Sequence, residues 1–280
     1  MIPLRDALVE TLLGWRQDMN PAWRQIVEDV HPGFEKISAS LMIEPWEPIF
    51  PTRRNRQFPG APTGAHLLRA FDRIRPEEVR CVLLGQDPYP CPAFSTGRAF
   101  EAGNTACWRE LDKMFSRSVR AFMLQIATAR TGCTSYESSF GQWPRLLSDI
   151  EGGRIDFEPP ASIADRWVDS GVLLLNSSLT LTRFSVDVNP HQSLGHLPLW
   201  RPLIVAVLRH LAASHSPIAV ITFGDAAADN ARRADIAGLT GIGIIERPHP
   251  ALADEFLACE NPFLACNMHL QRSGTTPVDW

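Results

Sequence analysis

Four short apolar runs, each followed closely by polar residues or glycine, constrain the fold of this chain more than any other sequence feature. Continuous apolar runs are typical of strands that are buried on both faces of a parallel sheet. Segments with helical character separate the runs, which predicts an α/β protein with a parallel sheet and helices on both faces. The expected strands are residues 79–84, 172–175, 218–223 and 242–245.

The helices are predicted from apolar spacing and from capping signals. Asn20 followed by Pro21 indicates a helix cap with proline at the first helical position. Ser162, with Asp165 three residues later, resembles a capping box. The expected helices are an N-terminal one with Leu4, Leu8, Leu12 and Trp15 at helical spacing, residues 108–129, a helix from Ser162, residues 198–211, a helix from Asp225, and residues 262–271.

The sequence predicts one main domain with an extension before it. Residues 1–60 are expected to form an N-terminal helical extension with a Pro- and Arg-rich loop, and residues 61–280 the α/β domain. Residues 133–160 are rich in Ser, Gly and Pro and break the strand–helix alternation. We interpret them as a long excursion from the domain.

The charge balance argues against a protein that binds polyanions through bulk charge, because 27 basic and 31 acidic side chains give a net charge of −4. A local basic groove is compatible with this value. Arg53, Arg54 and Arg56 form the densest basic cluster, and they either are solvated or contact phosphate. No run approaches about 18 apolar residues, and no basic start leads into an apolar run. We therefore expect a soluble, cytoplasmic protein.

The cysteines and the glycines indicate neither a metal nor a nucleotide cofactor. The six cysteines form no C-x-x-C pair, and none has a histidine at zinc-finger spacing. Free thiols in a reducing compartment are the expectation. The phosphate-binding pattern G-x-x-x-x-G-K-[ST], which a nucleotide-binding α/β protein would need, does not occur in the sequence.

Polar segments follow the four expected strands. Because ligands of open α/β sheets bind beyond the carboxyl ends of the strands, we expect these segments to converge on one cleft. They would bring together two amides, a carboxylate, a phenol and a histidine. The segments are residues 85–89, 176–178, 224–225 and 247–250.

Several motifs resemble those of family 1 uracil-DNA glycosylases. Residues 85–89 read G-Q-D-P-Y, where the family has G-Q-D-P-Y-H, and residues 97–100 read G-R-A-F, where it has G-L-A-F. Residues 171–176 match the family strand G-V-L-L-L-N. Residues 249–250 match the start of its H-P-S-P-L loop, and residues 274–280 resemble its ending G-E-T-P-I-D-W. The matches follow the family order.

The resemblance implies a three-layer α/β/α fold with a four-stranded sheet, and a metal-independent DNA repair enzyme. Such an enzyme flips uracil out of DNA and hydrolyses its N-glycosidic bond, which leaves an abasic site. Asp87 matches the catalytic aspartate, which offsets the positive charge on the sugar and orients the attacking water. His249 matches the catalytic histidine, a neutral imidazole that donates a hydrogen bond to uracil O2. The two lysines, Lys36 and Lys113, lie outside the motifs, so no lyase step is expected.

The resemblance also implies the residues that bind uracil. Asn176 matches the residue that reads the uracil edge, since one amide can donate to O4 and accept from N3–H. Its alternative role is to cap the next turn. Phe100 matches the aromatic that stacks on the base, and its alternative is an ordinary core position. Tyr89 matches the residue that blocks the thymine methyl, and Gln86 matches a residue that contributes polar contacts.

The loop after His249 departs from the family pattern, and this loop carries several of the expected DNA contacts. Leu252 is the candidate wedge for the gap left by the flipped base, with Phe256 as its rival. His191 has either a phosphate-adjacent or a purely structural role. The candidate DNA contacts are Pro88, Ser177, His191, Ser193, Pro250 and Leu252, with Ser178 as a further serine that could reach phosphate.

Other departures concern the surroundings of the site. Pro90 stands where the family has His, and proline offers neither a side-chain donor nor an N–H. Glu101 stands where the family has Ser, and His196 replaces a Trp. Asp254 and Glu255 beside DNA would be repulsive, which weakens duplex binding. The same loop change predicts weakened binding of the phage-encoded inhibitor protein that mimics DNA.

The expected partner is uracil-containing single- or double-stranded DNA. The protein is expected to be a monomer and not to associate with a membrane. Two alternatives remain open from the sequence. One is a related glycosylase with an altered base preference, against which the presence of Asn176, Tyr89 and Phe100 argues. The other is a catalytically weak DNA-binding relative, against which the presence of Asp87 and His249 argues.

Overall fold

The computed structural model describes residues 1–113, 116–182, 190–214 and 216–280. Four strands form a parallel sheet in the order β4-β3-β5-β6. The predicted fold class is therefore confirmed, and each expected strand lies within two residues of an observed one. The strands are β3 (Cys81–Gly85), β4 (Val172–Asn176), β5 (Ile218–Phe223) and β6 (Ile242–Arg247).

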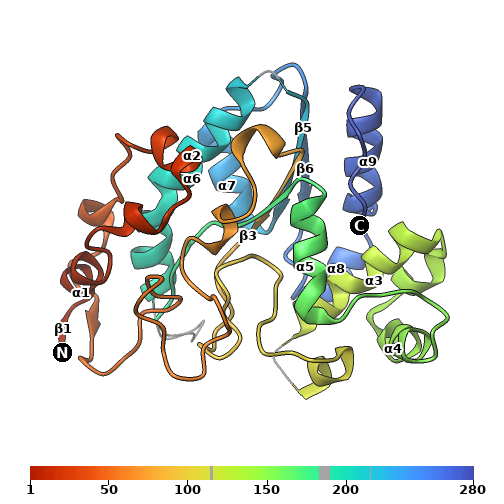
Figure 1. Ribbon diagram of the computed structural model, residues 1–280, viewed down its shortest axis with the longest axis horizontal. Coiled ribbons are helices and arrows are strands. Elements are labelled where there is room, and N and C mark those ends of the chain that lie inside the picture. The colour runs from red at the N-terminus through yellow and green to blue at the C-terminus, as the bar shows by residue number, and fades with distance from the viewer. Residues whose placement is uncertain (114–115, 183–189, 215) are drawn as a thin grey trace.

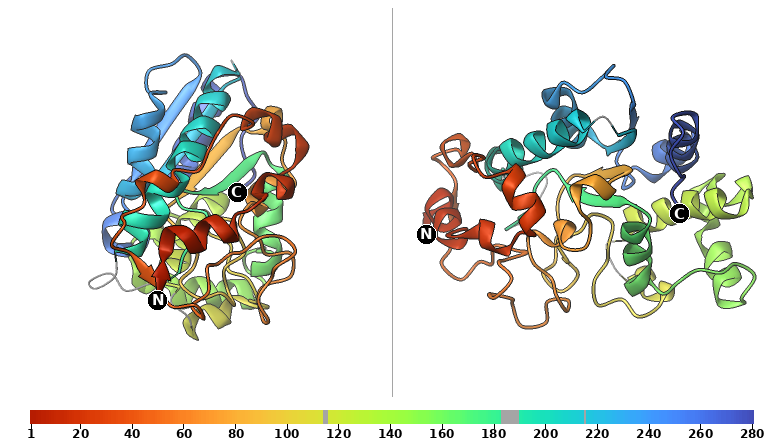
Figure 2. Two further views of the ribbon diagram at one scale, coloured as in Figure 1. Left: turned by 90° about the vertical axis from the view of Figure 1, so that its left-hand side faces the viewer. Right: turned by 45° about the horizontal axis from the view of Figure 1, so that its top comes forward.

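Helices cover both faces of this sheet, which makes three layers (Figures 1 and 2). One face carries α3 (Arg117–Thr131), α5 (Pro160–Asp169) and α9 (Pro262–Arg272). The other carries α6 (Leu197–Ala213) and α7 (Asp225–Ala234), which pack against each other. Within the described ranges, no helix is both long enough and apolar enough to cross a membrane.

The apolar runs became strands because the two layers of helices remove both of their faces from water. β3, β4 and β5 are buried along their whole length, whereas the edge strand β6 is only partly buried. Burial of this kind supplies most of the stabilisation of the sheet. Polar groups are therefore confined to the strand ends, and the site described below lies at the carboxyl ends.

The helix predicted for residues 108–129 is two elements. A 3-10 helix, η5 (Trp108–Lys113), comes first, and α3 begins at Arg117. Residues 114–115 of the predicted helix lie outside the described residues. The Trp108 indole donates to the Glu158 carbonyl at 2.9 Å, so this first turn follows a tertiary contact that helical periodicity does not report.

The predicted capping box at Ser162 is wrong. Helix α5 begins at Pro160, two residues earlier, and no side chain caps it. Asp165 instead forms ion pairs with Arg98 at 2.7 Å and with Arg73 at 2.7 Å. One buried guanidinium group, of Arg98, and one exposed one, of Arg73, compete successfully for a carboxylate that could otherwise serve the local backbone.

The excursion of residues 133–160 contains a helix that the sequence analysis missed. α4 (Trp143–Glu151) buries Trp143, Leu146 and Leu147 and contacts α3. The apolar positions have helical spacing, but the surrounding Ser, Gly and Pro obscured it. Two short 3-10 helices, η6 (Thr134–Glu137) and η7 (Phe140–Gln142), precede it, and α8 (Ala253–Leu257) contacts η7.

The expected N-terminal helix is shorter than its apolar spacing predicts, because α1 ends at Thr11 and Trp15 begins a separate 3-10 helix. α1 (Leu4–Thr11) buries Leu4 and Leu8, and α2 (Pro21–Ile26) begins after Asn20, whose side chain accepts from Ala22 N at 3.0 Å. Both helices belong to the same buried cluster as the sheet, with α2 against α6. The short strands and remaining 3-10 helices are β1 (Ile2–Pro3), β2 (Met42–Ile43), η1 (Trp15–Asp18), η2 (Phe34–Lys36), η3 (Arg69–Phe71) and η4 (Pro76–Glu78).

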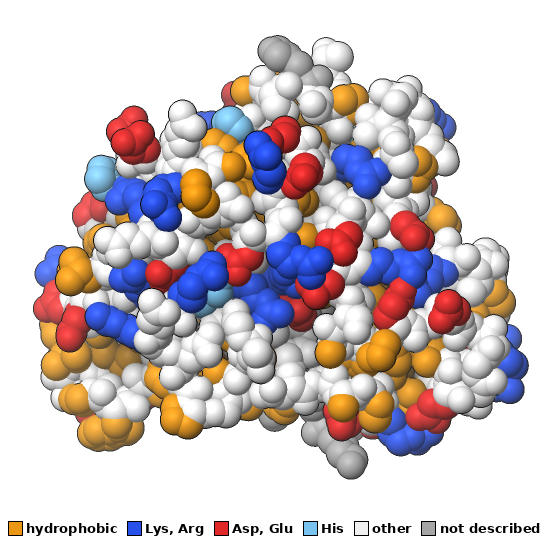
Figure 3. Space-filling view, viewed as in Figure 1, with side chains coloured by type: hydrophobic (Ala, Val, Ile, Leu, Met, Phe, Trp, Pro, Cys, Tyr) orange, Lys and Arg blue, Asp and Glu red, His pale blue; other side chains and the backbone are white. Residues whose placement is uncertain are grey.

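Two of the three arginines in the basic cluster of the Pro-rich loop form internal ion pairs. Arg53 binds Asp18 at 2.7 Å, and Arg54 binds Asp72 at 2.6 Å. Intermixed basic and acidic side chains also cover the face shown in Figure 3. The structural use of these two guanidinium groups disfavours the phosphate-contact alternative for them.

Candidate active site

Asn176 and Phe100 meet over Gly85 at the carboxyl edge of the sheet. Gly85 ends β3 and is paired in register with Asn176, the last residue of β4. A Cβ atom on Gly85 would lie 2.6 Å from Asn176 Oδ1 and 3.5 Å from the Phe100 ring carbon Cε2. Glycine is therefore required there, and its absent side chain lets an amide and an aromatic ring approach the same point.

Phe100 is held firmly although it is only half-buried. Its backbone φ of 60° lies in the left-handed region, which non-glycine residues seldom adopt. The ring stacks on Phe122 at 4.5 Å between centroids, and the Phe223 ring meets it edge-on at 4.9 Å. Such strain persists when the surroundings determine the conformation, and here aromatic packing does so.

Asp87 lies in the turn after β3, next to Pro88, which is buried. Burial raises the pKa of the Asp87 carboxyl to about 7, and a hydrogen bond with the Gln86 side chain opposes the rise. Gln192 Nε2 donates a second hydrogen bond, to Asp87 Oδ2. The sequence analysis missed Gln192, since its only signal was its position beside His191.

His249 is a half-buried histidine with a defined tautomer. Its Nδ1 accepts a hydrogen bond from Ala251 N at 3.2 Å, so the neutral ring carries its proton on Nε2. Burial lowers the pKa of His249, which favours that neutral form. Gly224, at φ 84°, passes close to the ring, because a Cβ there would lie 3.1 Å from His249 Cβ.

Tyr89 is partly buried in the same turn as Asp87. Burial raises the pKa of its phenol, and its hydroxyl is hydrogen-bonded with Ser118 at the start of α3. The ring therefore stays neutral and is tied at its tip. This leaves the ring body as a fixed apolar wall of the site.

The candidate DNA contacts divide into exposed and buried groups. Ser193 and Leu252 are exposed. Phe256, the rival wedge, is fully buried, so Leu252 is the one available side chain of the two. Pro88 and Pro250 are buried.

Three polar candidates are occupied inside the protein. Ser177 is fully buried and its hydroxyl donates to the Gly85 carbonyl at 2.8 Å. Ser178 is equally buried and donates to the Thr180 carbonyl. His191 is 2% exposed and bonds Thr182. Because their polar atoms satisfy buried partners, these contacts favour an internal role for the three side chains over contact with DNA.

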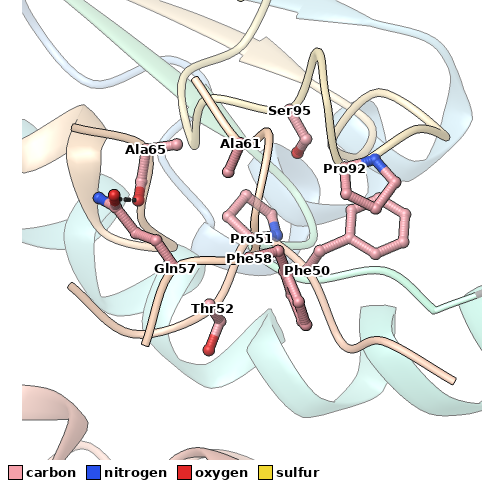
Figure 4. Close-up of a pocket in the computed structure, with 9 residues that line it drawn as sticks. All are labelled: Phe50, Pro51, Thr52, Gln57, Phe58, Ala61, Ala65, Pro92 and Ser95. Carbon is pink, nitrogen blue, oxygen red and sulfur yellow. Dashed lines mark hydrogen bonds between the residues drawn. The ribbon is translucent and has the colours of Figure 1, made fainter. Parts of the chain in front are cut away.

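A small hollow lies between the Phe50–Pro51 segment and the loop that carries Pro92 and Ser95 (Figure 4). Its volume is about 10 Å³, and no candidate residue lines it. In the described residues, no group of three or more His, Cys, Asp or Glu side chains is arranged to hold a metal ion. The candidate site is therefore the edge at which Asn176, Phe100 and their neighbours meet.

The fold and this edge define an α/β protein whose site suits a flat, hydrogen-bonding ligand. No protein-family model matches the chain. A curated uracil-DNA glycosylase from Mycolicibacterium vanbaalenii is 30% identical over 225 residues, which cover 78% of this chain and 80% of the relative. The chain belongs to the uracil-DNA glycosylase family.

Two further comparisons extend over nearly the whole chain. A uracil-DNA glycosylase from Exiguobacterium sibiricum is 24% identical over 262 residues, which cover 94% of this chain and 99% of the relative. The crystal structure of wild-type UNG from Nitratifractor salsuginis superposes with a TM-score of 0.60 at 25% identity, covering 94% of this chain and 96% of that one. The similarity therefore includes the N-terminal extension as well as the sheet.

Proposed function

We propose that this protein is a monofunctional family 1 uracil-DNA glycosylase that hydrolyses the N-glycosidic bond of deoxyuridine and leaves an abasic site. The observation that carries the proposal is the approach of the Asn176 amide and the Phe100 ring over Gly85. A flat pyrimidine needs both groups, a stacking surface and a polar edge. Family membership supports the same substrate.

Base selection follows from the chemistry of the amide. Asn176 is 4% exposed, so water does not compete for its hydrogen bonds. It would accept from uracil N3–H and donate to O4, a pattern that cytosine reverses. Tyr89 would exclude the 5-methyl group of thymine with the ring that its hydroxyl contact fixes. Gln86 contributes a side-chain hydrogen bond to Asp87 in the turn after β3.

Bond cleavage is assigned to Asp87 and His249. The departing uracil carries negative charge, and the neutral His249 would donate its Nε2 proton in a hydrogen bond to O2. The sugar develops positive charge, which the Asp87 carboxylate offsets while it orients the attacking water. The motifs offer no lysine for a Schiff base, which makes the enzyme monofunctional.

DNA engagement is proposed to rest on Leu252, Ser193 and the backbone near Pro88 and Pro250. Leu252 is 52% exposed after the His249 turn, where it can fill the gap left by the flipped base. Asp254 follows closely and pairs with Arg117 at 3.1 Å. This acidic, rebuilt loop should also weaken the phage DNA-mimic inhibitor; stoichiometric inhibition in an activity assay would refute that.

The decisive test is release of uracil from a single-stranded oligonucleotide with one deoxyuridine, in EDTA. A single strand removes the wedge requirement and isolates the chemistry. We expect release by the wild type and its loss in His249→Ala and Asn176→Ala. Release of cytosine or thymine instead would indicate an altered base preference, and no release from either strand form would favour a DNA-binding relative.

A further inference from the structure

The side chain of Gln192 reaches the carboxylate on which the proposed reaction depends. Its Nε2 donates to Asp87 Oδ2, across 105 positions of sequence. Gln192 begins a π-helical turn, η8 (Gln192–His196), that leads into α6. Turns of this type are rare and occur frequently at functional sites.

Hydrogen bonds on the α6 side hold this turn in place. The Trp200 indole donates to Thr180 Oγ1 at 2.8 Å, and Thr180 Oγ1 lies 2.9 Å from His196 Nδ1. Burial lowers the pKa of His196 to about 3, so its ring is neutral. The indole can only donate, so the Thr180 hydroxyl is free to donate to Nδ1, and the His196 proton lies on Nε2.

The same chain of bonds continues to the residue before Gln192. His196 Nε2 lies 3.2 Å from Thr182 Oγ1, and Thr182 Oγ1 lies 2.8 Å from His191 Nδ1. His191 Nε2 then bonds the Met42 carbonyl at 3.0 Å. A carbonyl can only accept, so His191 Nε2 donates to Met42. Each hydrogen bond in this series then donates in the direction from Thr180 to Met42. Gln192 therefore sits between two anchored histidines.

The N-terminal extension supports this turn from outside. Gly195 allows it, because a Cβ there would lie 2.9 Å from Leu4 Cδ2 and 3.1 Å from Leu41 Cδ1. Ser38 N also donates to the Leu194 carbonyl at 3.0 Å. The extension thus contacts the turn that carries Gln192, which ties it to the site.

We propose that Gln192 is a positioning residue for Asp87, whose amide N–H fixes one carboxylate oxygen and leaves the other to face the sugar and the attacking water. This inference rests on the proposed function. An amide is neutral, so it orients the carboxylate without neutralising the negative charge that the sugar cation needs. Pro90, in the turn itself, has neither an N–H nor a side-chain donor for this task.

The test compares Gln192→Leu and Gln192→Glu with the wild type on single-stranded deoxyuridine DNA. Glu keeps the length of the side chain, Leu is one atom shorter and apolar, and both lack the amide donor. We expect kcat to fall about 10- to 100-fold with little change in KM, because misplacing a reacting group costs rate rather than binding. Gln271→Leu, at an exposed position of α9, is the matched control and should keep wild-type kinetics.

A double-mutant cycle separates positioning from general damage. In an Asp87→Asn background, Gln192→Leu should lower the residual rate less than twofold, because the carboxylate it positions is gone. Equal losses in both backgrounds, or a kcat of Gln192→Leu within twofold of wild type, would overturn the proposal. A thermal melt within a few degrees of wild type shows that the variant is folded.

A measurement without turnover keeps this inference distinct from the proposed activity. The pKa of Asp87 is shifted by burial and by the Gln86 hydrogen bond. Neither cause is a charged group. Titration of its carboxyl carbon by NMR should show a higher pKa in Gln192→Leu than in wild type and Gln271→Leu. An unchanged value overturns the contact, whereas an inactive wild type with a shifted value overturns only the proposed activity.

Discussion

Asp87 shows a conflict between stability and chemistry within one residue. In the proposed reaction its carboxylate must be charged, yet burial raises its pKa from 3.8 to about 7. The folded protein therefore holds the proton to a higher pH than the unfolded chain does. Stability falls as pH rises from about 4 to 7, and the full cost is present above pH 7. Activity should rise over the upper part of the same window.

Asp87→Asn is predicted to stabilise the protein and abolish most of its activity. The neutral amide avoids the burial of charge, so the free energy of unfolding at pH 8 should rise by on the order of 1–2 kcal/mol. At pH 4 the gain should largely disappear. Urea unfolding at both pH values measures this, and an equal gain at pH 4 and pH 8 would contradict it.

At the scale of elements, the loop after β3 holds a buried ion pair. Arg98 and Glu101 are 2% and 4% exposed and pair at 3.4 Å, on either side of Phe100. Arg69 joins Glu101 and Asp165 joins Arg98. These four side chains form a charge network in which Arg98 and Glu101 each have a second partner of opposite charge. Arg98 and Glu101 flank Phe100 in the sequence, and the backbone of Phe100 is strained.

Glu101→Ser alone is predicted to destabilise the protein by about 2–4 kcal/mol, because it leaves Arg98 partly uncompensated in the interior. Arg98→Leu combined with Glu101→Ser should recover most of that loss, since it removes both charges. A urea-denaturation cycle with both single variants measures the coupling. Additive losses in the double variant would show that the pair does not act as a unit.

The turn between β6 and α8 carries Leu252, which is proposed to contact duplex DNA and to take no part in bond cleavage. Leu252→Ala is predicted to reduce kcat/KM about 10-fold or more on duplex DNA and less than twofold on single strands, because only the duplex needs its gap filled. Leu239→Ala, at another exposed leucine, is the control. Equal losses on both substrates would exclude a wedge role for Leu252.

At the scale of the whole molecule, the charge distribution limits how DNA is bound. The net charge is −4, and many arginines are already paired with carboxylates. Asp225, Asp254 and Glu255 are exposed near the carboxyl edge of the sheet. We therefore expect affinity for DNA to come largely from the extruded base rather than from phosphate contacts.

The predicted consequence is a shallow salt dependence. Between 50 and 200 mM salt, the Kd for single-stranded deoxyuridine DNA should rise about 10-fold or less, as expected for few phosphate contacts. Fluorescence anisotropy with the Asp87→Asn variant measures this without turnover. Asp225→Asn should tighten binding at 50 mM salt. A rise of 1000-fold would indicate an extensive basic interface instead.

The sequence by itself determined the strands and the segments at their ends. Apolar runs report burial directly, and the polar residues that close β3, β4 and β6 had to gather at one edge because parallel strands end there. The same reasoning found the cap at Asn20 and the start of α7 at Asp225. It failed at α4, where flanking Ser, Gly and Pro hid a short amphipathic helix, and at Ser162, where tertiary ion pairs outweighed a local cap.

Only the tertiary structure decided which side chains are free to act. Leu252 is exposed and Phe256 is buried, although both follow His249 closely. Ser177 and His191 turn inward to buried partners. The contact of Gln192 with Asp87 joins residues 105 positions apart. No local pattern encodes such pairings, because they depend on how packed layers bring distant segments together.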